Sequence, residues 1–210
     1  MAAPFEILPW AVIRGEEGLR GAGTVPLAEL TPVLEAALER HGKALLWDMD
    51  GIESNSPQLD FLRRFEGMGL WVDAGVRHAE GVIDVLVAGA DKAVVGTKSL
   101  WGLDELDKAF AYTDQNVVLQ IDYGGRILHP GRARVEPTAE ALLAWLSERG
   151  ADTLLFVSPS GPLEIPIIAP LCAKARVYAG KAPANDLGPL QAAGAAGAII
   201  DLWESVPWPS

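Results

Sequence analysis

The sequence predicts an α/β protein, a (β/α)8 barrel in which eight parallel strands alternate with helices. Short apolar runs suited to buried parallel strands alternate with amphipathic segments at helical spacing. The pattern also repeats in two halves, and eight strands built from two fused half-barrels close most simply into one barrel. The alternative, an open doubly wound sheet, requires a reversal of strand order that nothing in the pattern signals.

Each element follows from local signals. The apolar runs predict strands at residues 6–13, 43–49, 69–73, 92–96, 116–122, 153–158, 176–179 and 197–202. Helices are predicted at residues 27–41, 79–88, 137–149 and 185–193, each followed by a glycine that permits a left-handed turn into the next strand. Weaker helical patterns occupy residues 57–65, 103–112 and 162–174.

The internal repeat fixes a register between the two halves. Ala74-Gly75 recurs as Ala179-Gly180, and Gly89 recurs as Gly194, so both pairs have the same offset of 105 residues. A chain of 210 residues, half of them apolar, is long enough for one barrel. We therefore expect a single domain spanning residues 1–210.

Composition excludes several classes of partner. A net charge of -11 repels phosphate backbones and anionic bilayers, so we expect no nucleic acid and no membrane as partner. A small-molecule ligand or another protein remains. The longest apolar runs are far shorter than the roughly 20 residues of a bilayer span, and MAAPFEILPW lacks a charged leader, so we expect a cytoplasmic protein. Cys172 is the only cysteine and is interpreted as a buried, inert thiol. Neither a metal nor a cofactor is expected.

Polar residues gather where the predicted strands end, which is where barrels of this class carry their active sites. In chain order they are Asp48, Asp50, Asp73, Arg77, Gly96, Thr97, Lys98, Asp122, Ser158, Ser160, Lys181 and Asp201. Asp122 ends an apolar strand, and partial desolvation there raises the pKa of a carboxyl group and suits it to acid–base chemistry. The alternative is a carboxylate that caps the next loop. Trp101 either fills the core or stacks on a planar ligand.

Five stretches together resemble a known family: ILPWAVIRGEEGLR, LLWDMDGIESN, LWVDAGVRHAEGVIDVLVAGADKAVVGTKSL, VVLQIDYGGRIL and YAGKAPANDLGPLQAAGAAGAII. They are similar to phosphoribosylformimino-aminoimidazole-carboxamide ribotide isomerases and to the cyclase of imidazole-glycerol-phosphate synthase, which are barrels of histidine biosynthesis. WVDAGVR, VVGTKSL and the aspartate of the fifth strand look most like paralogues from organisms that use methanopterin and methanofuran. That likeness implies a role in making or handling a one-carbon cofactor.

The resemblance implies a phosphate site formed by Gly75, Arg77, Gly96 and Thr97, where backbone N–H groups and small residues let an anion approach. Asp73 and Ala74 stand where the family has glycines, which alters this cradle. By the repeat, Gly96-Thr97 corresponds to Asp201-Leu202 in the second half, and a carboxylate there repels an anion. Lys181, opposite Val76 in the repeat, is the one candidate for compensation. We therefore expect a compact ligand with a single phosphate or carboxylate.

The resemblance also implies a pair of aspartates acting as acid and base. Asp122 matches one of them, but the other falls at Val12, which cannot exchange a proton. Asp48 or Asp201 is the candidate substitute. We assign Asp122 and Asp48 as catalytic, and Asp50, Asp73, Trp101, Lys181 and Asp201 as ligand contacts.

Three functions remain open: a diverged enzyme performing proton transfer or carbonyl chemistry, an authentic ribotide isomerase with an unusual first strand, and a non-catalytic binding or assembly subunit. The last helix is expected to be short or missing, because only WESVPWPS follows the last strand. We expect Trp203 and Trp208 either to form a homodimer through this tail or to fold back over the exposed barrel surface.

Overall fold

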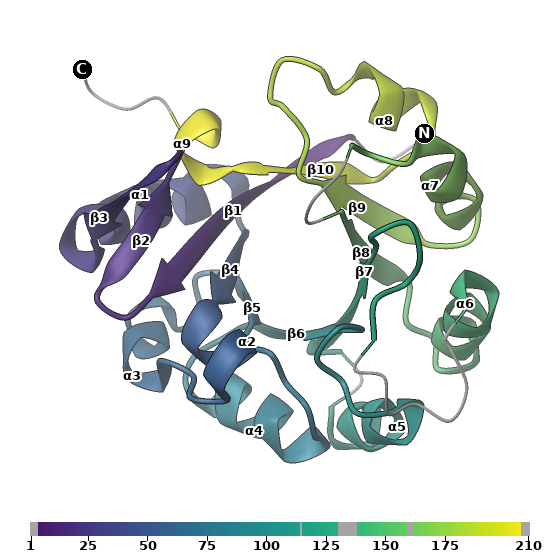
Figure 1. Cartoon of the computed structure of the whole chain (residues 1–210), viewed down its shortest axis with the longest axis horizontal. Coiled ribbons are helices and arrows are strands. Elements are labelled where there is room, and N and C mark those ends of the chain that lie inside the picture. Colours follow the sequence, from purple (N-terminus) through teal and green to yellow (C-terminus); the bar gives the residue numbers. More distant parts are fainter. Residues whose placement is uncertain (1–3, 114, 130–137, 159–161, 207–210) are drawn as a thin grey trace.

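A computed structural model describes residues 4–113, 115–129, 138–158 and 162–206. Its strands form a closed parallel barrel, in which the last strand pairs with the first and helices surround the ring (Figure 1). The barrel strands are β1 (Glu6–Arg14), β4 (Ala44–Asp48), β5 (Leu70–Asp73), β6 (Lys92–Gly96), β7 (Val117–Asp122), β8 (Thr153–Val157), β9 (Arg176–Gly180) and β10 (Gly197–Asp201). The predicted (β/α)8 fold is confirmed, and the open sheet is excluded.

The main helices lie where the amphipathic pattern predicted them. They are α1 (Leu27–His41), α4 (Ala79–Val87), α5 (Leu103–Tyr112), α6 (Ala139–Glu148), α7 (Ile165–Cys172) and α8 (Gly188–Ala192). The segment predicted at residues 57–65 forms α3 (Leu59–Leu62) and a 3-10 turn (Arg63–Phe65). Among the described residues, no helix has the length and apolar composition that crossing a bilayer requires. Pro137, Ser160 and Trp208, which entered the predictions above, lie outside the described residues.

The internal repeat has the predicted register. Strands β6 and β10 begin and end 105 residues apart, at Lys92 and Gly197 and at Gly96 and Asp201. Gly89 and Gly194 precede these strands and both adopt positive φ, 107° and 80°, which explains why glycine recurs there. Asp201 therefore occupies the strand-end position in the second half that Gly96 occupies in the first.

Two layers of apolar side chains build the core. A large cluster fills the space between strands and helices, and a smaller one, which includes Val12, Trp47, Trp71 and Tyr178, fills the barrel interior. Because side chains alternate along a strand, a residue two positions from an inward-facing one also faces inward. In β7 this alternation places Gln120 and Asp122 on the interior side.

Polar side chains close the N-terminal end of the barrel. The Tyr178 hydroxyl donates to Glu6 Oε2 at 2.5 Å, Lys43 Nζ donates to the Tyr178 oxygen at 2.8 Å, and Lys43 forms an ion pair with Glu6. Burial alone raises the pKa of Glu6, but the hydrogen bonds from Lys43 and Tyr178 and the charge of Lys43 outweigh it and lower that pKa. This end of the barrel is therefore closed, and the opposite end remains for a ligand.

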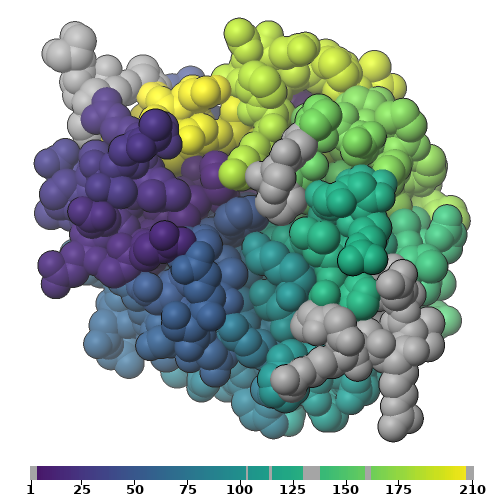
Figure 2. All heavy atoms as spheres, in the orientation of Figure 1, coloured from purple at the N-terminus to yellow at the C-terminus, as the bar shows by residue number. Residues whose placement is uncertain are grey.

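Two segments near the strand ends were not predicted. A hairpin of β2 (Glu17–Arg20) and β3 (Gly23–Pro26) follows β1, and helix α2 (Met49–Ser54) follows β4. The hairpin consists of two four-residue strands, too short for the periodicity that identified the barrel strands. In the space-filling view, the N-terminal segments, coloured purple, lie against the yellow C-terminal segment (Figure 2).

The chain after β10 folds back on the barrel. Residues Leu202–Ser205 form the short helix α9, whose Trp203 Nε1 donates to the Leu19 carbonyl oxygen at 2.9 Å. The Arg20 guanidinium lies 4.6 Å from the centre of the Trp203 ring, and His41 Nε2 is 3.2 Å from the Ser205 carbonyl oxygen. The expected short last helix is confirmed, and through Val206 the tail covers the barrel as the second alternative proposed. A homodimer through this tail stays a prediction.

Candidate active site

A cluster of buried polar side chains lies at the C-terminal end of the barrel. The Gln120 amide nitrogen donates to Asp73 Oδ2 at 3.1 Å and to Asp122 Oδ1 at 2.9 Å, so it bridges the two carboxyl groups. All three residues are fully buried. Lys98, in the loop after β6, has its Nζ 3.6 Å from Asp122 Oδ1, and its backbone nitrogen donates to Asp122 Oδ2 at 3.2 Å. Strands β5 and β7, with the loop after β6, therefore bring together two carboxyl groups and one ammonium group.

Gly96, between these strands, gives the carboxyl groups their space. A Cβ atom at this position would lie 2.8 Å from Asp122 Oδ2 and 3.6 Å from Asp73 Oδ2. A side chain would thus displace Asp122. The role expected for Gly96, close approach of an external phosphate, is not supported, because the protein's own carboxyl groups occupy the space beside it.

The environment keeps Asp122 protonated to unusually high pH. Burial raises the pKa of Asp122 to about 6, with Lys98 opposing the rise and Asp73 adding to it. Burial also raises the pKa of Asp73, while Lys98 and the hydrogen bonds from Gly75 and Gln120 oppose it. Two neighbouring carboxyl groups resist simultaneous ionisation, so the pair titrates as a unit. A group with a pKa near 6 can both accept and donate a proton near neutral pH.

Two tryptophans and two lysines surround this end of the interior. The Trp10 and Trp47 rings pack edge to face with centres 5.1 Å apart. Lys98 Nζ lies 4.4 Å from the centre of the Trp47 ring, and Lys181 Nζ lies 4.3 Å from that of Trp10 and 5.7 Å from that of Trp47. Both ammonium groups therefore share one indole ring. Lys181, an expected ligand contact, is thereby placed at the same end of the barrel as Asp122.

Three buried polar atoms of the described residues have no hydrogen-bond partner, namely the Nε1 atoms of Trp10 and Trp47 and the Oε1 atom of Gln120. Such orphaned groups are rare in folded proteins and call for an explanation. Here all three belong to residues of the same cluster. Two donors and one acceptor are therefore left unpaired in the interior beneath this end of the barrel.

Asp48, predicted as catalytic, lies in a different environment. Its Oδ1 accepts hydrogen bonds from the backbone nitrogens of Asp50 and Gly51, at 3.1 and 3.3 Å, and its Oδ2 accepts one from Gln58 at 2.5 Å. It is the N-cap of α2 and is fully buried. Asp50 accepts from the Gly15 nitrogen and the Gln58 side chain, at 2.7 and 2.8 Å. The geometry favours structural roles for both carboxylates, because backbone N–H donors already occupy them.

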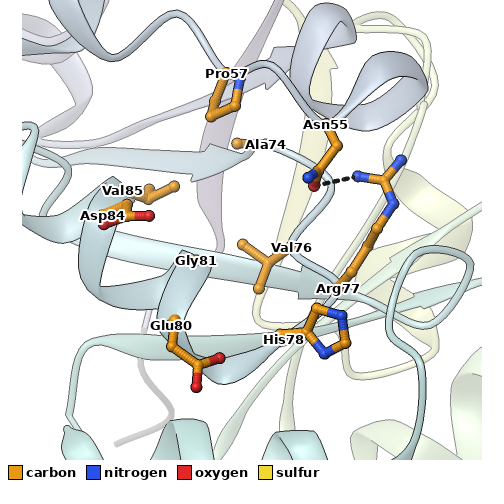
Figure 3. A pocket seen from close by; sticks show the side chains of 10 residues that line it. All are labelled: Asn55, Pro57, Ala74, Val76, Arg77, His78, Glu80, Gly81, Asp84 and Val85. Atoms are coloured by element: carbon orange, nitrogen blue, oxygen red, sulfur yellow. Dashed lines mark hydrogen bonds between the residues drawn. The ribbon is translucent and has the colours of Figure 1, made fainter.

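Arg77, predicted to bind phosphate, binds carbonyl oxygens instead. Its guanidinium donates to the backbone oxygens of Gly51, Ile52 and Gly75 at 2.9 to 3.1 Å and to Asn55 Oδ1 at 2.8 Å. Figure 3 shows Arg77 reaching toward Asn55 at the end of α2. The guanidinium therefore satisfies the C-terminal end of a helix, where a positive charge is favourable, and this geometry argues against an anion there.

The rest of the expected phosphate cradle is also filled internally. Gly75 adopts a φ of 64°, its nitrogen donates to Asp73 Oδ1 at 3.0 Å, and a Cβ on it would lie 2.4 Å from the Ile52 Cα. The Thr97 hydroxyl accepts the Asp122 N–H at 3.0 Å. At the start of α4, the Ala79 nitrogen donates to Glu105 Oε2 at 3.0 Å, so a carboxylate of the chain itself takes the anion position.

The remaining predicted contacts separate from the cluster or stay untested. Trp101 is 42% exposed and packs against His78, with ring centres 4.4 Å apart. Asp201 caps α9 by accepting from the Trp203 nitrogen at 2.9 Å, and burial raises the pKa of Asp201. Val12 faces the apolar interior in register with Trp47, so the position of the missing acid holds no titratable group.

A hollow lies outside the barrel, between α4 and the segment after α2. It has a volume of about 240 Å³ and is lined by Asn55, Pro57, Ala74, Val76, Arg77, His78, Glu80, Gly81, Asp84 and Val85 (Figure 3). Its one arginine is engaged as described above, and its carboxylates repel anions. Among the described residues, no group of three or more His, Cys, Asp or Glu side chains is arranged to hold a metal ion.

Sequence reasoning overlooked the residue that joins the cluster. Gln120 is the one polar side chain inside the apolar run Val117–Ile121, and it lies two positions before Asp122 on the same face of the strand. That spacing was a usable signal. Lys98 was noted as a strand-end residue but given no role, because its contact with Asp122 crosses between adjacent strands.

Comparison with known proteins agrees with the fold and the sequence resemblance. A family profile described as histidine biosynthesis protein matches residues 32–160, more than half of the 210-residue chain. A comparison with curated proteins gives no match. The matched region includes Asp73, Lys98, Gln120 and Asp122. The chain belongs to the histidine biosynthesis protein family.

Proposed function

We propose that this protein is an enzyme that moves a proton on a small carbonyl compound carrying one carboxylate or phosphate group. The observation that carries the proposal is the buried pair Asp73 and Asp122, bridged by Gln120 and facing Lys98 at the C-terminal end of the barrel. A carboxyl group with a pKa of about 6 in that position has the properties of a general acid and base.

Each group of the cluster has a distinct role in the proposed reaction. Asp122 in its carboxylate form removes a proton from the carbon next to the carbonyl group and returns it to a neighbouring atom of the intermediate. The ammonium group of Lys98 stabilises the negative charge that develops on the substrate oxygen. Asp73 raises the pKa of Asp122, and Gln120 holds the two carboxyl groups in place.

The reaction of the ribotide isomerases is a weaker candidate for this chain. That reaction, as the resemblance implies it, uses a second aspartate where this chain has the buried, interior Val12. Asp48, one candidate substitute, is held by three backbone N–H groups. We expect the unmodified gene not to restore growth to a histidine auxotroph lacking the isomerase. Full restoration would return the protein to the histidine pathway.

The proposed proton transfer is tested directly by solvent exchange. The protein is incubated in D2O with a panel of phosphate- and carboxylate-bearing aldehydes and ketones, and loss of proton signals beside the carbonyl is followed by NMR. The panel includes carbonyl precursors of methanofuran and methanopterin, because the sequence resemblance points to one-carbon cofactors. We expect exchange of at least one compound.

Two matched variants locate the exchange activity. Asp122→Asn is expected to lower the rate by about 10²-fold or more, the usual contribution of a general base. Asp84→Asn makes the same chemical change in the outer hollow and is expected to leave the rate unchanged. Equal rates in Asp122→Asn and the parent protein would refute the assignment of Asp122. Absence of exchange across the panel would favour a non-catalytic binding subunit.

A further inference from the structure

Lys181 occupies a position that the proposed proton transfer does not use. It follows β9 directly, and although the residue as a whole is exposed, its ammonium group lies against the indole rings of Trp10 and Trp47. Val76 stands at the equivalent position in the first half of the barrel, 105 residues earlier, so the lysine is specific to this half. A lysine at a strand end, accessible to a ligand and backed by aromatic rings, is placed to react.

We propose that Lys181 is a catalytic amine that captures the carbonyl group of the substrate as an imine. The proposal rests on the proposed function, in that the substrate carries a carbonyl group, and it adds covalent chemistry at a second residue. A protonated imine attracts electrons more strongly than a carbonyl group, so it would acidify the neighbouring C–H bond that Asp122 is proposed to deprotonate.

The groups facing Lys181 favour its unprotonated form. Partial burial of its ammonium group lowers the pKa of Lys181, the positive charge of Lys98 lowers it further, and Asp201 opposes both. A neighbouring cation and partial desolvation are recognised ways of activating a lysine as a nucleophile, and here they act against the attraction of the Trp10 and Trp47 ring faces for the ammonium form. Lys98 is the less suitable nucleophile, because its Nζ forms an ion pair with the buried carboxylate of Asp122 at 3.6 Å.

The step balances without any further reactant. The free amine of Lys181 adds to the carbonyl carbon, forming a C–N bond and an alcohol. The alcohol oxygen takes up a proton and leaves as water, while the nitrogen lone pair forms the C=N bond of a protonated imine. One proton is consumed in total, supplied by solvent or by the carboxyl group of Asp201, and burial raises the pKa of that group.

The first test measures the reactivity of the Lys181 amine in the absence of any substrate. The intact protein is treated at pH 7 with 1-fluoro-2,4-dinitrobenzene, and labelling of Lys181 and of the exposed Lys174 is followed by peptide mass spectrometry. Because the pKa of Lys181 is lowered, a larger fraction of its side chains is unprotonated at pH 7, so we expect Lys181 to be labelled faster than Lys174. Lys98→Met is expected to slow Lys181 and Asp201→Asn to accelerate it, because the two variants remove opposite charges.

The second test traps the imine. The protein is incubated with pyruvate or with dihydroxyacetone phosphate and sodium cyanoborohydride, which reduces an imine to a stable amine. We expect the adduct on Lys181 and not on Lys174, and none at that position in Lys181→Arg. The two compounds distinguish a carboxylate-bearing from a phosphate-bearing substrate.

Labelling of Lys181 no faster than Lys174 would overturn the proposal, and so would an adduct spread evenly over exposed lysines or absent from Lys181. The labelling rate depends on neither a substrate nor Asp122. Failure of the deuterium exchange therefore refutes the proposed function alone, and failure of the labelling refutes the role of Lys181 alone.

Discussion

Replacing the buried Asp122 with asparagine should stabilise the fold at neutral pH while removing the proposed proton transfer. The side chain is fully buried, and burial raises its pKa from 3.8 to about 6. A raised carboxyl pKa means that the folded state favours the neutral form. Below the unfolded-state pKa, ionisation of Asp122 therefore does not affect the free energy of unfolding. As the pH rises further, ionisation lowers this free energy progressively, and the full loss is reached above pH 6.

The magnitude follows from the two pKa values. One pKa unit corresponds to about 1.4 kcal/mol, so ionised Asp122 lowers the free energy of unfolding at pH 7 by about 3 kcal/mol. Asparagine removes this penalty and keeps an acceptor for the Lys98 backbone N–H. Its NH2 group faces the Gln120 amide. A rotation that turns Gln120 Oε1 toward it also removes the bond from Gln120 Nε2 to Asp73, so the gain stays below the full amount.

Urea unfolding at pH 3.5 and pH 7 measures the effect. We expect Asp122→Asn to exceed the parent protein by up to about 3 kcal/mol at pH 7, which for a chain of this size is roughly 6–12 °C in Tm. At pH 3.5 the two proteins should agree closely, because Asp122 is then protonated. The reasoning that burial destabilises this carboxylate would be refuted if Asp122→Asn were less stable than the parent protein at pH 7. It would also be refuted if the variant exceeded the parent protein by the same amount at both pH values.

Other residues should respond differently. Asp48→Asn should lower the free energy of unfolding by about 1–3 kcal/mol in urea, because its amide cannot accept all three backbone N–H groups; unchanged stability would count against the cap. Arg77→Gln should destabilise by a similar amount yet leave any rise in Tm caused by added sulfate unchanged; loss of that rise would restore the anion site. Because its pKa is lowered, ionised Glu6 stabilises the fold. This stabilisation is complete above about pH 4.5 and is lost as the pH falls through the folded-state pKa. In urea titrations over that acidic range, Glu6→Gln should therefore lose less stability than the parent protein. Trp203→Phe should cost about 0.5–1.5 kcal/mol and leave the mass measured by light scattering unchanged; a change in mass would support the dimer.

Local patterns in the sequence were sufficient for most of the barrel. The predicted strands agree with the observed ones to within two residues at each end, and α1 and α5 have the predicted bounds. Apolar periodicity and glycine stops are properties of short segments, so they can be read without knowing the rest of the fold. The hairpin after β1 and α2 escaped because they are short and take their stability from contacts with the barrel.

The candidate site divides in the same way. The sequence by itself determined that Asp48, Asp73, Asp122 and Lys181 stand at strand ends, and the observed strand bounds agree. Each of these residues directly follows or ends an apolar run, so its place along the strand can be read from its sequence neighbours. It did not determine which groups each carboxylate meets. Only the tertiary structure decided this, because Asp48 meets three N–H donors of the following loop whereas Asp122 meets Gln120, Lys98 and Asp73 across neighbouring strands. A carboxyl group's pKa depends on the donors and charges that folding brings within a few ångströms, and that set is not written in the residues beside it.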